Sequence, residues 1–356
     1  MAPSALHHFT HFFLLFFLVT LQSTYIAASV PAIIVFGDSS VDTGNNNAIA
    51  TILRSNFEPY GRDFDGGKPT GRFSNGRIPA DFISEFFGLK KTVPAYLDPL
   101  YNVSDFATGV CFASAGTGYD NATSAVLSVI PLWKEVNYYK EYQARLRDYL
   151  GEQKANKILS EALYLISMGT NDFLENYYST TQRTRSSQFT VKQYQDFLVG
   201  IVKGFLEELY ELGARKISLG GLPPMGCLPL ERTTNIMGGN ACVEEYNNVA
   251  MQFNSKLKDL SDQLNDELPG IKVVLSNPYG ILLKAITQPS LYGFVETSRA
   301  CCATGRFEMG FMCNQFSPFT CIDATKYVFW DSFHPTERAN NIVSRYVFKK
   351  ILNQFV

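Results

Sequence analysis

Five short apolar runs alternate with longer helical patterns along this chain of 356 residues. The runs cover residues 32–36, 110–113, 162–168, 216–219 and 271–275. Their length and composition are typical of buried strands. Strands that alternate with helices favour a parallel sheet covered by helices on both faces. The sequence therefore predicts an α/β fold, and an apolar content of 46% is ample for its core.

The helical patterns between these runs have recognisable ends. Patterns over residues 79–87, 132–150 and 191–212 each stop before a glycine, which favours helix termination. A further helix is marked by an apolar stripe that consists of Val243, Tyr246, Ala250, Phe253, Leu257, Leu260 and Leu264. After Pro335 we expect a last helix with Thr336 as its N-cap. Its inward-facing residues are predicted to be Ile342, Val343, Tyr346, Val347 and Ile351.

The first 28 residues have the pattern of a secretory signal peptide. An uncharged apolar block over residues 12–21 is shorter than the ~20 residues of a spanning helix, and small residues follow it. We predict cleavage near Ala28 and a secreted, extracellular protein, with the cell wall as one destination. A retained membrane anchor is the alternative. No later stretch is apolar enough to span a bilayer, so no stable membrane insertion is expected.

The remaining residues, 29–356, are predicted to form a single domain. They contain no internal repeat, no low-complexity tract and no linker that would divide them. The formal net charge is only −2, which favours neither nucleic acid nor an anionic membrane as partner. Nothing in the sequence indicates an oligomeric state.

The cysteines indicate disulfide bonds, because the predicted compartment is oxidising. Cys227 and Cys242 bracket a glycine-rich loop and are the first predicted pair, a closure that contributes about 3 kcal/mol. At least one more bridge is expected within the group formed by Cys301, Cys302, Cys313 and Cys321. The odd total of seven cysteines leaves one thiol, for which Cys111 is the natural candidate. Two sequons, at Asn102 and Asn121, predict N-glycosylation.

Polar residues follow three of the predicted strands, where parallel sheets bind their ligands. Ser39 comes three residues after the first run, glycine-rich residues 114–118 follow the second, and Asn171 follows the third. Taken singly, each has a plainer interpretation: a turn, a flexible loop, or an Asx turn. The loop also resembles a phosphate loop, but no lysine follows it, and no serine lies in a G-x-S-x-G elbow.

A base for Ser39 is available near the C-terminus. Three of the four histidines lie in the predicted signal peptide, so the mature chain keeps only His334, and Asp331 precedes it by three positions. A serine, an imidazole and a carboxylate are the components of an acyl-transfer nucleophile system. A surface histidine near an aspartate is usually incidental, but here it occurs together with the three strand-end segments. Zinc would also need histidines, so no metal is expected.

Together these segments resemble the plant branch of the GDSL esterases and lipases, in the SGNH-hydrolase superfamily. The resemblance is carried by the motifs FGDSSVDTGNNN at 36–47, TGRFSNGR at 70–77, LGARK at 212–216 and GLPPMGC at 221–227. Two positions depart from the family pattern. Ser40 stands where the family name has Leu, and Cys111 stands where many relatives have Asn, where we expect a packing role.

The resemblance implies a three-layer α/β/α fold with a five-stranded parallel sheet in flavodoxin-like order. It implies Ser39 as nucleophile, with His334 and Asp331 completing a triad. It also implies an oxyanion hole formed by the Ser39 and Gly116 backbone N–H groups and the Asn171 side chain, with Gly118 as a substitute for Gly116.

The predicted function is therefore a secreted carboxylic-ester hydrolase that acts on a small-molecule or polymer ester. Neither a metal nor an organic cofactor is needed for this chemistry. Two alternatives stay open at this point. One is an acyltransferase that uses the same site, and the other is a non-catalytic secreted binding protein on the same fold.

Overall fold

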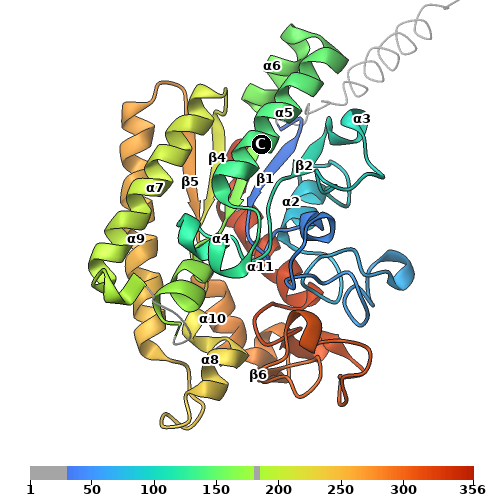
Figure 1. Ribbon diagram of the computed structural model, residues 1–356, viewed down its shortest axis with the longest axis vertical. Helices are drawn as coiled ribbons and strands as arrows, with labels where there is room; N and C mark the ends of the chain where they lie inside the picture. The colour runs from blue at the N-terminus through green and yellow to red at the C-terminus, as the bar shows by residue number, and fades with distance from the viewer. Residues whose placement is uncertain (1–29, 180–184) are drawn as a thin grey trace, which may run out of the picture.

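The computed structural model describes residues 30–179 and 185–356, and a five-stranded parallel sheet forms its centre (Figure 1). In spatial order the strands are β2 (Gly109–Cys111), β1 (Ile33–Gly37), β3 (Leu163–Ser167), β4 (Lys216–Gly220) and β5 (Lys272–Ser276). All five predicted runs are strands, and the predicted α/β fold with this sheet is confirmed.

Helices cover both faces of the sheet, because the central strands are apolar on both sides. Ile34 and Phe36 of β1 belong to the large core beneath α5 (Leu132–Leu150), α7 (Val191–Glu211) and α9 (Glu244–Glu267). The alternate residues of β1, at positions 33 and 35, belong to a second core. That core includes side chains of α2 (Pro79–Phe86) and α11 (Glu337–Lys350). Each face therefore buries one set of alternating side chains.

The three helices predicted with both bounds agree with α2, α5 and α7 to within one residue at their ends, and the predicted apolar stripe lies on α9. Thr336 caps α11 by accepting a hydrogen bond from the Ala339 N–H. The expected inward face of α11 is wrong at Tyr346, whose side chain is 40% exposed, whereas Val347 is buried. The two positions are neighbours on a helix, so they point in directions about 100° apart and cannot both face the core.

Further short elements were not predicted. The α-helices among them are α3 (Val103–Phe106), α4 (Asn121–Leu127), α6 (Glu152–Glu161), α8 (Pro229–Thr234) and α10 (Tyr279–Thr287). The single turns are η1 (Asn45–Ala48), η2 (Asp65–Gly67), η3 (Asp172–Tyr177, a π-helix), η4 (Arg185–Ser187), η5 (Met225–Cys227), η6 (Pro289–Tyr292), η7 (Gly310–Met312), η8 (Ala324–Lys326) and η9 (Leu352–Phe355). Segments this short carry too few turns for an apolar period to be recognised.

A second, small sheet lies outside the central one, in the orange to red part of Figure 1. It consists of β6 (Glu296–Ala300) and β7 (Tyr327–Phe329), which pair in parallel. The residues of β6 read ETSRA, a polar sequence without an apolar run, which is why it was not predicted. Because β7 ends at Phe329, this sheet sets the position of the following segment, which carries Asp331 and His334.

Three disulfides are present, and they confirm that these cysteines form bridges. Cys227 pairs with Cys242 as expected. The other two bridges, Cys301–Cys321 and Cys302–Cys313, brace the segment that links β6 to β7, which we call the disulfide lobe (residues 301–323). Cys111 is the buried free cysteine, and it packs in the second core.

The predictions of a signal peptide, of glycosylation and of the extent of the single domain stay predictions. The signal peptide, residues 1–28, lies outside the described residues. Asn102 and Asn121 are both exposed at their sequons, and nothing here tests their glycosylation. The extent of the single domain, residues 29–356, is likewise untested. Within residues 30–179 and 185–356, none of the helices has both the length and the apolar character needed to cross a bilayer.

Candidate active site

Three loops meet at the carboxyl edge of the sheet, because β1 pairs with β2 on one side and with β3 on the other. Ser39 lies two residues beyond β1, and Asn171 lies four residues beyond β3. The third loop follows β2 and carries Gly116. The loops are joined directly, since the Asp38 N–H donates to the Ser167 carbonyl and the Ser114 N–H donates to the Gly37 carbonyl.

Ser39, His334 and Asp331 form a continuous chain of hydrogen bonds. The Oγ of Ser39 lies 2.8 Å from Nε2 of His334. The other ring nitrogen, Nδ1, lies 2.8 Å from Oδ1 and 2.9 Å from Oδ2 of Asp331. Asp331 is fully buried and His334 is 6% exposed, so both side chains are largely shielded from solvent. The structure thus brings together three residues from opposite ends of the chain.

A tight turn presents Asp331 and His334 on the same side. The Trp330 N–H donates to the His334 carbonyl at 2.7 Å, which closes the turn. Inside it, Oδ1 of Asp331 accepts the backbone N–H groups of Phe333 at 2.9 Å and His334 at 2.7 Å. These two bonds orient the carboxylate toward the imidazole of its own turn.

Gly116 and Asn171 line the same small cavity as Ser39 and His334, of about 50 Å³. Gly116 has a φ of +88°, and a Cβ atom there would lie 2.5 Å from Cδ1 of Leu53, so a larger residue would clash. The alternative, Gly118, does not line this cavity. A Cβ atom at Gly118 would lie 2.3 Å from the carboxyl group of Asp172. Of the two glycines, Gly116 is therefore the one that lines the small cavity with Ser39.

The Asn171 side chain is held by one hydrogen bond. Its Nδ2 donates to the Thr117 carbonyl at 2.9 Å, and Asn171 itself is buried. A primary amide has two N–H bonds, so the second remains for a ligand in the cavity. The bond also ties the loop after β3 to the loop after β2.

Buried carboxyl groups fix the backbone around the cavity. Asp42 accepts the N–H groups of Gly44 and Asn45 through Oδ1, both at 2.8 Å, and the Ala115 N–H through Oδ2 at 3.0 Å. Burial raises the pKa of Asp42 to about 6, and these hydrogen bonds oppose that rise. Asp42, in the polar segment after β1, therefore holds the first part of the loop that carries Gly116.

A second carboxyl group holds the far end of that loop. Asp172 accepts the backbone N–H groups of Tyr119 at 2.8 Å and Asp120 at 3.0 Å, and the Thr123 hydroxyl at 2.6 Å. Burial raises the pKa of Asp172 to about 7. Between them, Asp42 and Asp172 restrain both ends of the segment that presents Gly116.

A larger cavity, of about 130 Å³, also has Ser39 in its lining. It shares four lining residues with the small cavity, namely Ser39, Phe73, Phe333 and His334. Phe73 packs against the imidazole, with ring centroids 4.8 Å apart. The wall farther from Ser39 is mainly apolar and includes Met168, Leu222, Leu228, Leu282 and Val343. Ser39 thus belongs to the lining of both cavities, and both linings are mainly apolar.

Two more carboxyl groups face this region. Asp38 lines the larger cavity, and burial raises its pKa to about 6 against the hydrogen bonds from Ser40. Glu175 lines the small cavity, and burial raises its pKa as well. Among the residues described, no group of three His, Cys, Asp or Glu side chains is arranged to hold a metal ion.

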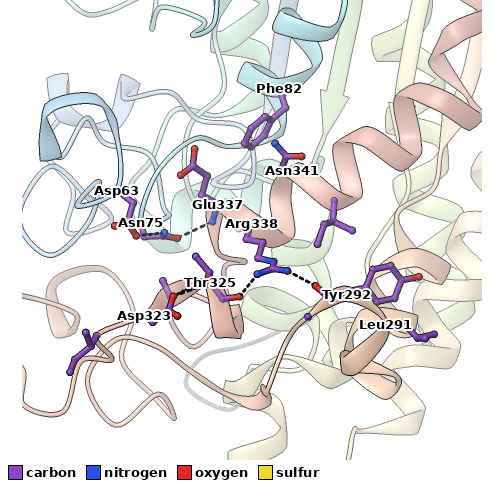
Figure 2. A pocket seen from close by; sticks show the side chains of 14 residues that line it. Asp63, Asn75, Phe82, Leu291, Tyr292, Asp323, Thr325, Glu337, Arg338 and Asn341 are labelled. Carbon is purple, nitrogen blue, oxygen red and sulfur yellow. Dashed lines mark hydrogen bonds between the residues drawn. The ribbon is translucent and has the colours of Figure 1, made fainter.

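A groove with a larger volume, about 750 Å³, lies away from Ser39 (Figure 2). It shares no lining residue with either cavity at Ser39. Its polar groups pair with one another: Arg338 donates to the carbonyls of Thr325 and Tyr292, and Asn75 donates to Asp63. Because these groups are satisfied within the protein, the groove is a weaker candidate than the cavities at Ser39.

The sequence did not indicate several residues of the site. Tyr60 donates a hydrogen bond to Oδ2 of Asp331 across 271 positions of the chain. The apolar wall residues come from four different segments, and no local pattern marks them. Contacts over such separations leave no trace in the spacing of a single sequence.

Comparison with known proteins places the chain in a family. The sequence profile of the GDSL-like lipase/acylhydrolase family matches residues 33–347. The protein called GDSL esterase/lipase At2g42990, from Arabidopsis thaliana, is 60% identical over 351 residues, which is 99% of each chain. GDSL esterase/lipase At4g26790, from the same plant, is 63% identical over 328 residues, which is 92% of this chain and 93% of that protein.

These matches span the sheet, all three loops at its carboxyl edge and the turn that carries His334. With the resemblance in the motifs, they identify the chain: it belongs to the GDSL-like lipase/acylhydrolase family.

Proposed function

We propose that this protein is a secreted carboxylic-ester hydrolase in which Ser39 is the nucleophile, His334 the general base and Asp331 its orienting carboxylate. The observation that carries the proposal is the unbroken chain of hydrogen bonds from Ser39 through His334 to Asp331. The family and the esterase/lipase relatives support the same class of reaction.

The first half of the reaction forms an acyl-enzyme. Ser39 Oγ attacks the carbonyl carbon of the ester while Nε2 of His334 takes the hydroxyl proton. The carbonyl oxygen becomes an oxyanion, and the bond to the alcohol oxygen then breaks as His334 returns its proton to the leaving alcohol. Asp331 holds Nδ1 in its protonated form, which leaves Nε2 free to accept from Ser39.

The second half uses water in the place of the alcohol. His334 removes a proton from the water, whose oxygen attacks the acyl carbon. The bond to Ser39 Oγ breaks, and Oγ regains the proton from His334. Acid is released and the enzyme is restored, so the cycle consumes one ester and one water.

We assign the oxyanion to the small cavity. The backbone N–H groups of Ser39 and Gly116 and the free N–H of Asn171 would donate to it. The lining of that cavity by all three residues supports this assignment.

Asn171→Ala is expected to lower kcat by about 10²–10³-fold with little change in KM, because the lost donor acts mainly in the transition state. Steady-state hydrolysis of a soluble chromogenic ester measures both constants. Asn176→Ala is the matched control, since Asn176 is a buried asparagine of the same segment that lines neither cavity at Ser39. A fall of less than about three-fold in kcat for a well-folded Asn171→Ala variant would contradict the assignment.

Secretion is part of the proposal. Its support is the predicted signal peptide and the three disulfides, which persist in oxidising compartments. Glycosylation at Asn102 and Asn121 is proposed with it, since both side chains are exposed.

A fluorophosphonate probe tests the proposal without knowledge of the natural ester. The probe phosphonylates an activated serine, and mass spectrometry of the digested protein locates it. We expect label on the peptide with Ser39, and none in the Ser39→Ala variant or in heat-denatured protein. Native protein that stays unlabelled, or that is labelled at another serine, would refute the nucleophile assignment.

A further inference from the structure

Tyr60 connects the disulfide lobe to the carboxylate of Asp331. The Tyr60 side chain is fully buried. Its hydroxyl lies 2.6 Å from Oδ2 of Asp331 and accepts the Gly310 N–H at 2.8 Å. Gly310 begins η7 inside the lobe, and it also lines the small cavity at Ser39.

The direction of these bonds is fixed by chemistry. The Gly310 N–H can only donate, so it uses a lone pair of the Tyr60 oxygen. The phenol proton is then directed to Asp331, which accepts. Burial and the neighbouring Asp331 charge raise the pKa of Tyr60 well above its ordinary value, so the phenol keeps this proton.

The position of the Tyr60 ring is tightly determined. Phe57 and Phe73 pack against it edge-on, each with a centroid separation of 5.8 Å, and Trp330 lies 6.2 Å away. Phe73 also packs on His334. In the disulfide lobe, the Cys302–Cys313 bridge closes the segment that supplies the Gly310 N–H to the Tyr60 hydroxyl.

Asp331 therefore has two sets of hydrogen-bond donors. Oδ1 receives the backbone N–H groups of its own turn, and Oδ2 receives the hydroxyl of Tyr60. The Nδ1 atom of His334 lies between the two oxygens. Without Tyr60, the carboxylate keeps its local bonds and loses the one that comes from the rest of the fold.

We propose that Tyr60 is a positioning residue for the hydrolytic reaction, which acts through Asp331 by fixing the plane of the carboxylate and offsetting part of its charge. This inference rests on the proposed function, because it takes Asp331 and His334 as members of the triad. Tyr60 does not line either cavity at Ser39 and so does not touch the substrate.

The charge effect has a definite sign. A carboxylate that loses a hydrogen-bond donor attracts a neighbouring imidazolium more strongly, so the His334 proton is released at a higher pH. Other charged groups nearby are Asp38 and Glu175, which line the cavities with His334, and Arg62, which stacks on Trp330 beside Tyr60. All of them are retained when Tyr60 is replaced, so a difference between variants is due to the hydroxyl.

The test is Tyr60→Phe, compared with Tyr142→Phe. Tyr142 is also fully buried, and its hydroxyl donates to the Phe106 carbonyl at 3.2 Å, away from the site. The secreted protein is labelled with ¹³C-histidine, and the His334 C–H resonance is titrated by NMR. A His334→Gln sample identifies that resonance. Thermal unfolding and steady-state ester hydrolysis are measured on the same samples.

For Tyr60→Phe we expect the His334 titration midpoint to rise by about half a pH unit. The acidic limb of the kcat/KM profile should move with it, and kcat at the optimum should fall about ten-fold with KM unchanged. Tyr142→Phe should lower the melting temperature without moving the midpoint. An unchanged midpoint and pH profile in folded Tyr60→Phe, or equal shifts in both variants, would overturn the inference.

The NMR titration does not depend on turnover. If the proposed function fails, fluorophosphonate leaves Ser39 unlabelled, while the titration still reports whether Tyr60 acts on the pair formed by Asp331 and His334. The two failures are therefore distinguishable.

Discussion

Ser39→Ala is expected to lower kcat for a soluble ester by at least about 10⁴-fold, because it removes the atom that forms the acyl-enzyme. His334→Ala should cause a loss of similar size. The Ser39 hydroxyl keeps its proton when Nε2, which lies 2.8 Å away, is absent. The remaining rate would come from binding and from oxyanion donors, which these changes leave in place.

The double variant makes this prediction sharper. If Ser39 and His334 act as one unit, the Ser39→Ala/His334→Ala enzyme should be no slower than either single variant, within a few-fold. Ser84→Ala is the control for a buried hydroxyl remote from the site, since its Oγ donates to the Lys90 carbonyl. Losses that multiply in the double variant would mean that the two residues act independently.

Asp331→Asn is expected to lower kcat by about 10⁴-fold while the protein stays folded. The backbone N–H groups of Phe333 and His334 both donate to Oδ1, so the amide oxygen should take that place. The amide nitrogen then occupies the place of Oδ2, where it donates to Nδ1 and no longer accepts the Tyr60 hydroxyl. An imidazole that accepts at Nδ1 carries its proton on Nε2, where it cannot take the proton of Ser39.

Kinetics and spectroscopy together check this second prediction. The rate of ester hydrolysis measures the loss, and ¹⁵N chemical shifts of His334 report which ring nitrogen holds the proton. Asp323→Asn serves as the control, because Asp323 is exposed, caps η8 and lines neither cavity at Ser39. A loss below ten-fold, or an unchanged tautomer, would show that Asp331 does not set the state of His334.

The sequence was sufficient for the central sheet and not for the second one. Buried parallel strands must be apolar on both faces, so β1, β3 and β4 appear as apolar runs whatever surrounds them. The strand β6 has charged and polar residues and an incompletely buried surface, and its pairing with β7 is a long-range contact. The partner strand β7 lies beyond the disulfide lobe, and no periodicity indicates that pairing.

The candidate site divides in the same way. Ser39, Asn171 and the loop with Gly116 could be anticipated because strand ends in a parallel sheet share one edge. Tyr60 could not, since its link to Asp331 arises only when the loop before α2 folds against the disulfide lobe. The different surroundings of Gly116 and Gly118 could not be predicted either, because two glycines so close in one loop carry no sequence pattern that distinguishes them.

The meeting of two cavities at Ser39 has a consequence for the fate of the acyl group. If a bound ester extends one half into each cavity, the departing alcohol vacates one compartment while the acyl half keeps the other occupied. Whichever hydroxyl compound next enters the vacated compartment decides the product. Water gives an acid, and a second alcohol gives a new ester. The walls of that compartment would then influence the partition between these products, because they decide which acceptor reaches the acyl carbon beside His334.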